Sequence, residues 1–171
     1  IHAEKSRCRD CAMMRNSYQV GIAGMKIARS PDQLCAIGLG SCVGVALYDP
    51  AARIGGLIHI LLPIYADFAA GNHIRTKFAD SGISDLVDEM VAQGASKRRM
   101  KAKIAGGAAM FASAGEAIGL RNVESCRQTL RNLGIQLVAQ DTGGNKGRTI
   151  YFDLETGNLT VRMADGPEKS I

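Results

Sequence analysis

The fold is decided by the stretch Gly38-Leu39-Gly40-Ser41-Cys42-Val43-Gly44-Val45-Ala46-Leu47-Tyr48. Its first glycines predict a tight turn, because glycine adopts backbone conformations that other residues avoid. The apolar run that follows predicts a buried strand. Cys42 stands at the junction, where main-chain N–H groups can converge beside its thiol. Such a junction suits a cysteine nucleophile with an oxyanion hole, and an inert buried cysteine is the alternative.

A cysteine nucleophile needs a nearby base, and His59 is the best-placed histidine. It lies in the apolar run of residues 56–62, and Asp49-Pro50 predicts a turn between this run and the strand after Cys42. The two strands would then be neighbours, with His59 beside Cys42. The alternative is a core histidine whose ring is merely hydrogen-bonded. His73 lies in a polar stretch that predicts a solvated loop.

The remaining pattern predicts an α/β fold, a mixed β-sheet sandwich flanked by two long helices. One helix begins near Ile83 and ends near Gly94, with apolar residues at helical spacing. The second carries Val123 and Cys126 on its apolar face, with Asn122 expected as its N-cap and Gly134 just past its end. Other expected strands cover residues 18–22, 25–28, 34–37, 101–105, 135–139, 148–154 and 159–163.

Length and composition indicate a globular protein. The chain has 171 residues, of which 46% are hydrophobic and 22% charged. These values exclude a disordered, collagen-like or coiled-coil chain. We expect an N-terminal arm over residues 1–17, one domain over 18–163 and a C-terminal tail over 164–171. No apolar run is long enough for a membrane span. No secretory signal is apparent in residues 1–17, so we expect a cytoplasmic protein with reduced thiols.

The net charge of +5 does not predict a nucleic-acid site. The basic residues are dense only over residues 97–103, where no aromatic residue is interleaved, although single-stranded nucleic acid usually stacks on aromatic rings. We expect this run to be a solvated loop that leads into a strand, with contact to an acidic protein surface as the alternative.

The other cysteines and glycine-rich turns give weaker signals. Cys8 and Cys11 form a single CxxC, whereas a zinc site usually needs further ligands. Cys35 and Cys126 are expected to be inert core residues. The turn at 38–43 lacks the third glycine of a dinucleotide-binding loop. The loop 143–147 is expected to be a structural turn, with an anion cradle as the alternative. No metal or organic cofactor is predicted.

Several motifs together resemble the CheD family, the chemoreceptor glutamine deamidases of bacterial and archaeal chemotaxis. The resemblance covers roughly residues 18–163, and the motifs occur in the family's order. They are the stretches 38–45, 48–50, 55–63, 77–80, 103–111, 118–122, 141–148 and 156–157.

This resemblance implies both an activity and a set of site residues. The activity is hydrolysis of particular glutamine side chains to glutamate on methyl-accepting chemotaxis receptors, and the implied fold is similar to that of the cytotoxic necrotizing factor toxins. Cys42 matches the family's nucleophile and His59 its general base. The family's third residue is usually a threonine at the position of Ala36, so we expect the Ala36 carbonyl to orient His59. Ser41 is expected to support the site, and Gly40 to contribute a backbone N–H to the oxyanion hole.

The resemblance also implies partners: the cytoplasmic helices of the receptors and CheC, a phosphatase of the chemotaxis response regulator. We expect a monomer or a heterodimer with CheC, and no nucleic acid or inserted membrane segment. Two other functions remain open. One is a non-catalytic regulator of CheC, and the other is a receptor methylesterase that uses the same cysteine and histidine.

Overall fold

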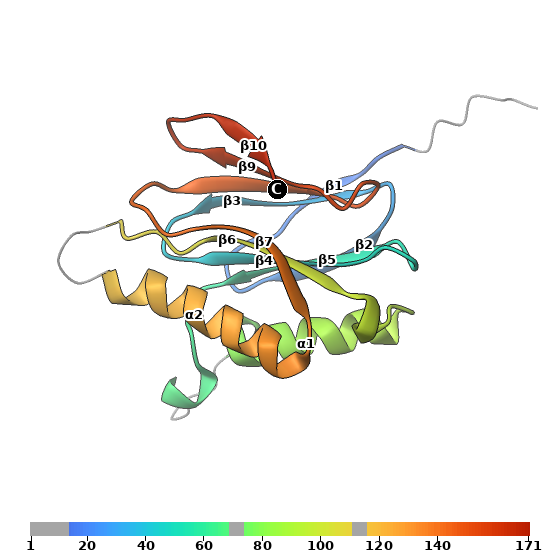
Figure 1. The fold of residues 1–171 in the computed structure, drawn as a ribbon, viewed down its shortest axis with the longest axis horizontal. Helices are drawn as coiled ribbons and strands as arrows, with labels where there is room; N and C mark the ends of the chain where they lie inside the picture. Colours follow the sequence, from blue (N-terminus) through green and yellow to red (C-terminus); the bar gives the residue numbers. More distant parts are fainter. Residues whose placement is uncertain (1–13, 69–73, 111–115) are drawn as a thin grey trace, which may run out of the picture.

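Two five-stranded sheets pack face to face, and two helices cover the outer face of one of them (Figure 1). The computed structural model describes residues 14–68, 74–110 and 116–171. The first sheet has the order β1-β3-β8-β9-β10 and the second the order β2-β5-β4-β6-β7. The β1–β3 and β6–β7 pairs are parallel, and the other neighbours are antiparallel.

Each sheet combines strands from different parts of the chain. The first sheet contains β1 (Ser17–Gln19), β3 (Gln33–Leu39), β8 (Arg148–Asp153), β9 (Leu159–Met163) and β10 (Glu168–Ser170). The second sheet contains β2 (Met25–Arg29), β4 (Val43–Asp49), β5 (Ile54–Ile60), β6 (Lys101–Gly106) and β7 (Gln136–Thr142). The helices are α1 (Ala79–Ala92), α2 (Glu116–Leu133) and the short 3-10 turns Tyr65–Phe68, Arg75–Lys77 and Lys97–Arg99.

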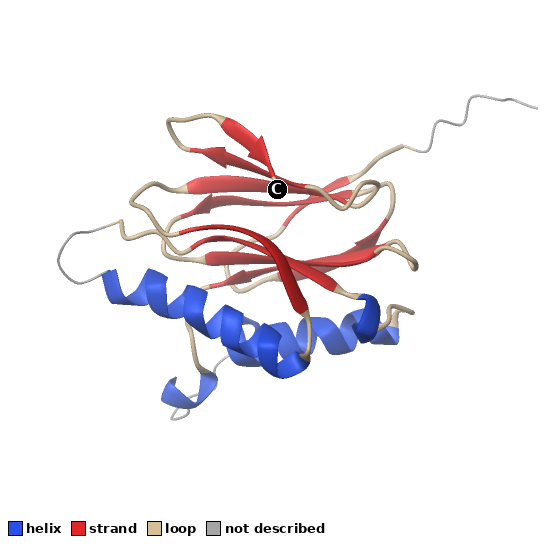
Figure 2. Cartoon of the chain, in the orientation of Figure 1, coloured by secondary structure: helices blue, strands red, loops and turns tan. Residues whose placement is uncertain are grey.

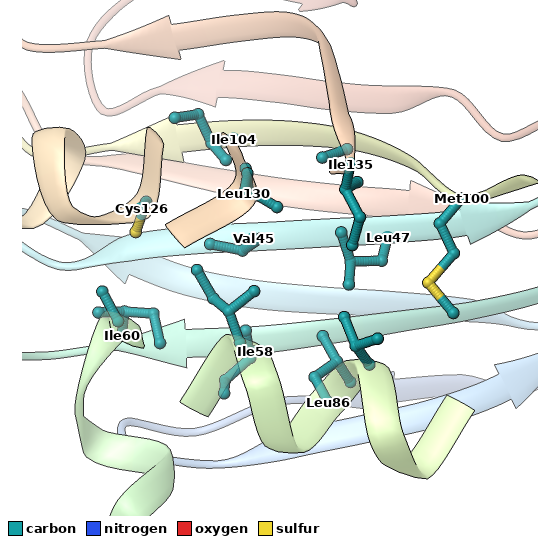
Figure 3. Packing of buried hydrophobic residues seen from close by; sticks show 14 of the residues in the cluster. Val45, Leu47, Ile58, Ile60, Leu86, Met100, Ile104, Cys126, Leu130 and Ile135 are labelled. Atoms are coloured by element: carbon teal, nitrogen blue, oxygen red, sulfur yellow. The ribbon is translucent and has the colours of Figure 1, made fainter. Parts of the chain in front are cut away.

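The second sheet is apolar on both faces because it is the middle layer. Val45 and Ile58 belong to the core shared with the helices, whereas Ala46 and Leu57 belong to the core shared with the first sheet. Neighbouring residues of a strand point to opposite faces, so β4 and β5 divide their side chains between the two cores. Figure 3 shows Val45 and Ile58 among the side chains of the helix-side core, together with Leu86 of α1.

The predicted α/β sandwich with two long helices is confirmed, and both helices lie on the same side of it (Figure 2). The helix that was expected to begin after Asn122 begins at Glu116 instead, so Asn122 lies inside α2. The short strand β10 lies within the segment expected to be a tail. Its polar residues carry no apolar pattern, and it pairs with β9 through main-chain groups.

Candidate active site

Cys42 immediately precedes β4, at the end of the turn that leaves β3. The chain leaves the first sheet at the end of β3. The β3–β8 register shifts between Ala36 and Leu39, and Gly38 has a positive φ of 70°. The Cys42 side chain is 8% exposed and belongs to the core between the sheets. The thiol therefore lies at one end of the inter-sheet layer.

His59 reaches the same inter-sheet layer from β5. The two strands are antiparallel, and Gly44 is paired with His59. Residues two apart in a strand share a face, so His59 lies on the side that carries Leu57, which belongs to the inter-sheet core. Cys42 and His59 thus come from adjacent strands and the same face, as predicted. Gly44 contributes no side chain between them.

The His59 ring is oriented by the carbonyl of Val20, and the expectation for Ala36 is wrong. The Nδ1–H group donates to the Val20 oxygen at 3.2 Å. Ala36 lies fully buried in β3, paired with Ile150. Val20 follows β1 in the segment that passes from the first sheet to the second, and this crossing brings its carbonyl to the ring.

The same crossing segment also holds the backbone of His59. The Ala23 N–H donates to the His59 carbonyl, and the His59 N–H donates to the Gly24 carbonyl, each at 3.0 Å. The Thr76 hydroxyl donates to the Ala23 carbonyl at 2.6 Å. The ring and main chain of His59 are therefore fixed by one short segment.

The bond to Val20 determines the tautomer. Because Nδ1 carries the proton, Nε2 holds a lone pair, and Nε2 is buried with no hydrogen-bond partner among the described residues. Burial lowers the pKa of His59 below its ordinary value of 6.5, partly offset by the bond to Val20. The ring is thus neutral at pH 7, with one nitrogen free to accept a proton.

Burial raises the pKa of the Cys42 thiol above its ordinary value of 9.0, and a hydrogen bond from the residue's own backbone N–H acts in the opposite direction. The resting pair is therefore a neutral thiol and a neutral imidazole. Transfer of one proton from sulfur to Nε2 would create the thiolate only when a substrate is in place. This arrangement fits general-base activation.

The turn before Cys42 is held by the segment that follows β6. The Gly107 N–H donates to the Cys42 carbonyl and the Ala108 N–H to the Gly40 carbonyl, each at 2.8 Å. A Cβ on Gly106 would overlap the Cys42 carbonyl, so only glycine allows this close approach. Among the described residues, the Ser41 hydroxyl makes no hydrogen bond to the His59 ring.

Asn122 is the site residue that the sequence pattern misassigned. It is completely buried in α2, and its Nδ2 donates to the carbonyls of Ser41 and Leu61, each at 3.0 Å. Those carbonyls lie beside Cys42 and at the end of the His59 strand. The expected role as an N-cap is wrong, because the helix continues through this position.

The loop 143–147 is a structural turn, as predicted. The buried Arg148 guanidinium donates to the carbonyls of Asp141 and Gly143 and to the Asp141 carboxylate. The Gly143 N–H donates to the Gly106 carbonyl at 3.0 Å, so it is not available to an anion. A ring of carbonyls around a cation does not suit an anion. The alternative of an anion cradle is therefore wrong.

The basic run over residues 97–103 is largely engaged within the fold. Arg99 donates to the buried Asp49 carboxylate, Lys101 to the Gln136 side chain and Lys103 to the main-chain oxygen of Gly157. The run forms a 3-10 turn and the start of β6 rather than one solvated loop.

The two other described cysteines, Cys35 and Cys126, are not part of the site. Cys35 and Cys126 are buried, and burial raises the pKa of both thiols. Within residues 14–68, 74–110 and 116–171, no group of histidine, cysteine or acidic side chains is arranged to hold a metal. His2, Cys8, Cys11 and His73 lie outside the described residues.

Comparison with known proteins identifies the family. The family model for CheD chemotactic sensory transduction matches residues 61–163. A Moorella thermoacetica protein named "Probable chemoreceptor glutamine deamidase CheD" is 50% identical over 158 residues, which cover 90% of this chain and 94% of the relative. The chain belongs to the CheD family. A Thermotoga maritima protein named "Chemoreceptor glutamine deamidase CheD" is 42% identical over 150 residues, which cover 88% of this chain and 94% of that one.

One solved structure shares the fold of this CheD family member. It is a Neisseria meningitidis protein assigned to the family model DUF152, with a TM-score of 0.51 and 11% sequence identity. The match covers 76% of this chain and 64% of that one. The expected similarity to the cytotoxic necrotizing factor toxins stays a prediction. In the part of the chain that the structure describes, no helix is long and apolar enough to cross a membrane.

Proposed function

We propose that this protein hydrolyses glutamine side chains of chemotaxis receptors to glutamate, with Cys42 as nucleophile and His59 as general base. The observation that carries the proposal is the hydrogen bond that fixes the orientation and the tautomer of the His59 ring. The Val20 carbonyl holds the proton on Nδ1, and Nε2 has no hydrogen-bond partner among the described residues. His59 lies on the face and near the strand end where Cys42 lies. Membership of the CheD family supplies the substrate class, because the relatives are named chemoreceptor glutamine deamidases.

The reaction has two steps, formation of a thioester on Cys42 and its hydrolysis, and His59 accepts and returns one proton in each. In the first, the Cys42 proton passes to Nε2 of His59 and sulfur attacks the amide carbon. The carbon–nitrogen bond then breaks, and the imidazolium returns its proton to the leaving ammonia, which leaves a thioester. In the second, a water gives a proton to Nε2 and its oxygen attacks the thioester. Cys42 leaves with that proton, and the product is glutamate.

The tetrahedral intermediate carries a negative oxygen that needs donors. The turn containing Gly40 and Cys42 offers main-chain N–H groups, and the Cys42 N–H belongs to the same residue as the attacking sulfur. Backbone donors that are fixed before the reaction stabilise such an oxyanion without reorganising. We therefore assign the Cys42 N–H as one oxyanion donor and keep Gly40 as a second.

The receptor helices are the proposed macromolecular substrate, CheC the proposed regulatory partner and the cytoplasm the proposed location. We also propose a monomer or a heterodimer with CheC. A methylesterase would use the same pair, since esters and amides share a tetrahedral intermediate. A regulator of CheC without catalytic activity would need neither Cys42 nor His59. The Cys–His pair favours an enzyme over a regulator without catalytic activity, and the names of the relatives favour the deamidase over the methylesterase.

Mass spectrometry of a purified receptor fragment distinguishes the three functions. Deamidation replaces an amide NH₂ by OH, demethylation removes a methylene group, and binding alone leaves the mass unchanged. We expect Cys42→Ala to abolish deamidation while the protein remains folded. Cys35→Ala is the matched control, because it also removes a buried thiol but from β3, outside the inter-sheet core that contains Cys42, and its activity should persist. Glutamate formation by Cys42→Ala would rule out the thiol mechanism.

A further inference from the structure

We infer that Asn122 is a positioning residue that orients the Cys42 N–H toward the oxyanion of the intermediate. The inference rests on the proposed thiol mechanism and extends it to a side chain on the opposite side of the sheet. Asn122 lies in α2, on the helix side of the second sheet, whereas Cys42 faces the inter-sheet core. Its Nδ2 donates to the two strand-end carbonyls, whereas its Oδ1 is buried with no hydrogen-bond partner among the described residues.

The first step is the identity of the group that faces these carbonyls. The oxygens of Ser41 and Leu61 both lie 3.0 Å from Nδ2 of Asn122. Carbonyl oxygens only accept hydrogen bonds, so the nitrogen and not the oxygen of the amide must face them. One NH₂ group has two donors, and each is used. A side chain of the same shape without these donors would place an oxygen against two carbonyls.

The second step is the geometry of the peptide between Ser41 and Cys42. This peptide is trans, and in a planar trans peptide the C=O and N–H bonds point in opposite directions. When Asn122 fixes the Ser41 carbonyl, it also turns the Cys42 N–H away from the helix.

The third step is the role of the second carbonyl. In the β4–β5 register, Val43 is opposite Ile60, which places Leu61 across from Cys42. Asn122 therefore joins the two strand ends just beyond their last paired residues. The spacing of the two strands is already set by the β4–β5 pairing, which includes Gly44 and His59. The bond to Leu61 therefore serves to hold the Asn122 amide in the orientation in which its other N–H meets the Ser41 carbonyl.

The test compares the deamidation and thiol chemistry of Asn122→Ala. Loss of one oxyanion donor lowers the turnover number by about 100-fold or more, so we expect a fall of that order in kcat with KM within about threefold of wild type. Iodoacetamide alkylates Cys42 without forming an oxyanion. We therefore expect the alkylation rate and its pH dependence to stay within about twofold. Asn122→Asp keeps the side-chain shape without the NH₂ group and should lose kcat in the same way.

Ser125→Ala is the matched control for the Asn122 variants. Ser125 is on the same helix, and its hydroxyl donates to a carbonyl just beyond β5, that of Pro63, at 2.7 Å. That carbonyl is not adjacent to Cys42, so kcat should be unchanged. A folded Asn122→Ala enzyme with wild-type kcat would overturn the inference. So would a parallel loss of deamidation and alkylation, which indicates a purely structural role.

Two further outcomes separate this inference from the function on which it rests. If Cys42→Ala remains active, the proposed function fails; if it is inactive while Asn122→Ala is fully active, only the role of Asn122 fails. Should both Asn122 variants unfold, NMR of the wild-type protein decides. We expect couplings across hydrogen bonds from the Asn122 side-chain nitrogen to the Ser41 and Leu61 carbonyl carbons. A coupling from the Cys42 N–H to any backbone carbonyl would refute the inference.

Discussion

Replacing Gly44 by alanine should destabilise the sandwich at the point where the catalytic strands meet the first sheet. A Cβ at this position would lie 2.5 Å from Cδ1 of Ile150 and 3.3 Å from Cδ1 of Leu39. Carbon atoms in contact are normally about 3.5–4.0 Å apart, so Ile150 must move by about 1 Å. Gly44 has no positive φ, and the backbone itself accepts alanine.

The cost follows from overpacking. Inserting a methyl group into a filled core costs about 1–3 kcal/mol, and replacing a strand glycine returns about 0.5–1 kcal/mol of backbone entropy. We expect Gly44→Ala to lose about 1–2 kcal/mol of unfolding free energy, measured by urea denaturation. For a chain of this length, the melting temperature should fall by about 2–8 °C.

The double mutant with Gly44→Ala and Ile150→Val tests whether contact with Cδ1 of Ile150 causes the loss of stability. Ile150→Val removes Cδ1, and the next atom of that side chain is 3.7 Å from the new Cβ, an ordinary contact. Alone, Ile150→Val should cost about 0.5–1.5 kcal/mol, but in the Gly44→Ala background it should cost little or restore stability. Gly21→Ala is the control, because its Cβ meets nothing within 4 Å. Strictly additive losses, or no loss in Gly44→Ala, would contradict the argument.

Two predictions concern ionisable groups. Burial holds the pKa of His59 below 6.5 in the folded protein. Deamidation should therefore persist at pH 6.5 and fall only at lower pH, where the imidazolium cannot accept a proton. An acid midpoint above pH 7 in the rate profile would contradict this. Burial raises the pKa of Asp49, but hydrogen bonds from Arg99 and the N–H groups of Ser96 and Ala52 outweigh it and lower the pKa from 3.8 to about 2. Its contribution to stability should therefore be complete above about pH 4 and be lost as the pH falls from 3.8 toward 2. Asp49→Ala should cost about 1–3 kcal/mol in urea denaturation at pH 7, because the N–H groups of Ser96 and Ala52 lose their acceptor. An unchanged midpoint would show that these bonds contribute nothing.

The catalytic strands were predictable because their signals are local. A glycine turn, an apolar run from Val43 to Tyr48 and the Asp49-Pro50 turn define β4 and its return into β5. Once the two strands are adjacent, the alternation of side chains places Cys42 and His59 on one face. The hairpin alone therefore accounts for much of the site.

The partners of the site were less predictable because they arrive through main-chain groups or from distant elements. The Val20 carbonyl has no side-chain signature, and its position depends on how the chain crosses between the sheets. Asn122 resembles an N-cap in sequence, since buried asparagine is unusual inside a helix. Its real partners, Ser41 and Leu61, are brought to it only by the packing of α2 on the sheet.

Because of the segment from Val20 to Gly24, the site of protonation on the His59 ring depends on the packing of both sheets. The acceptor for Nδ1 leaves the first sheet, while the ring belongs to the second. Any motion that opens the layers at this end removes the acceptor and lets the imidazole carry its proton on either nitrogen. The rings that carry their proton on Nε2 would then be poor bases although every catalytic side chain is still present. The ability of His59 to accept a proton on Nε2 thus depends on how both sheets pack. Natural variation in this packing can alter the rate without changing Cys42 or His59.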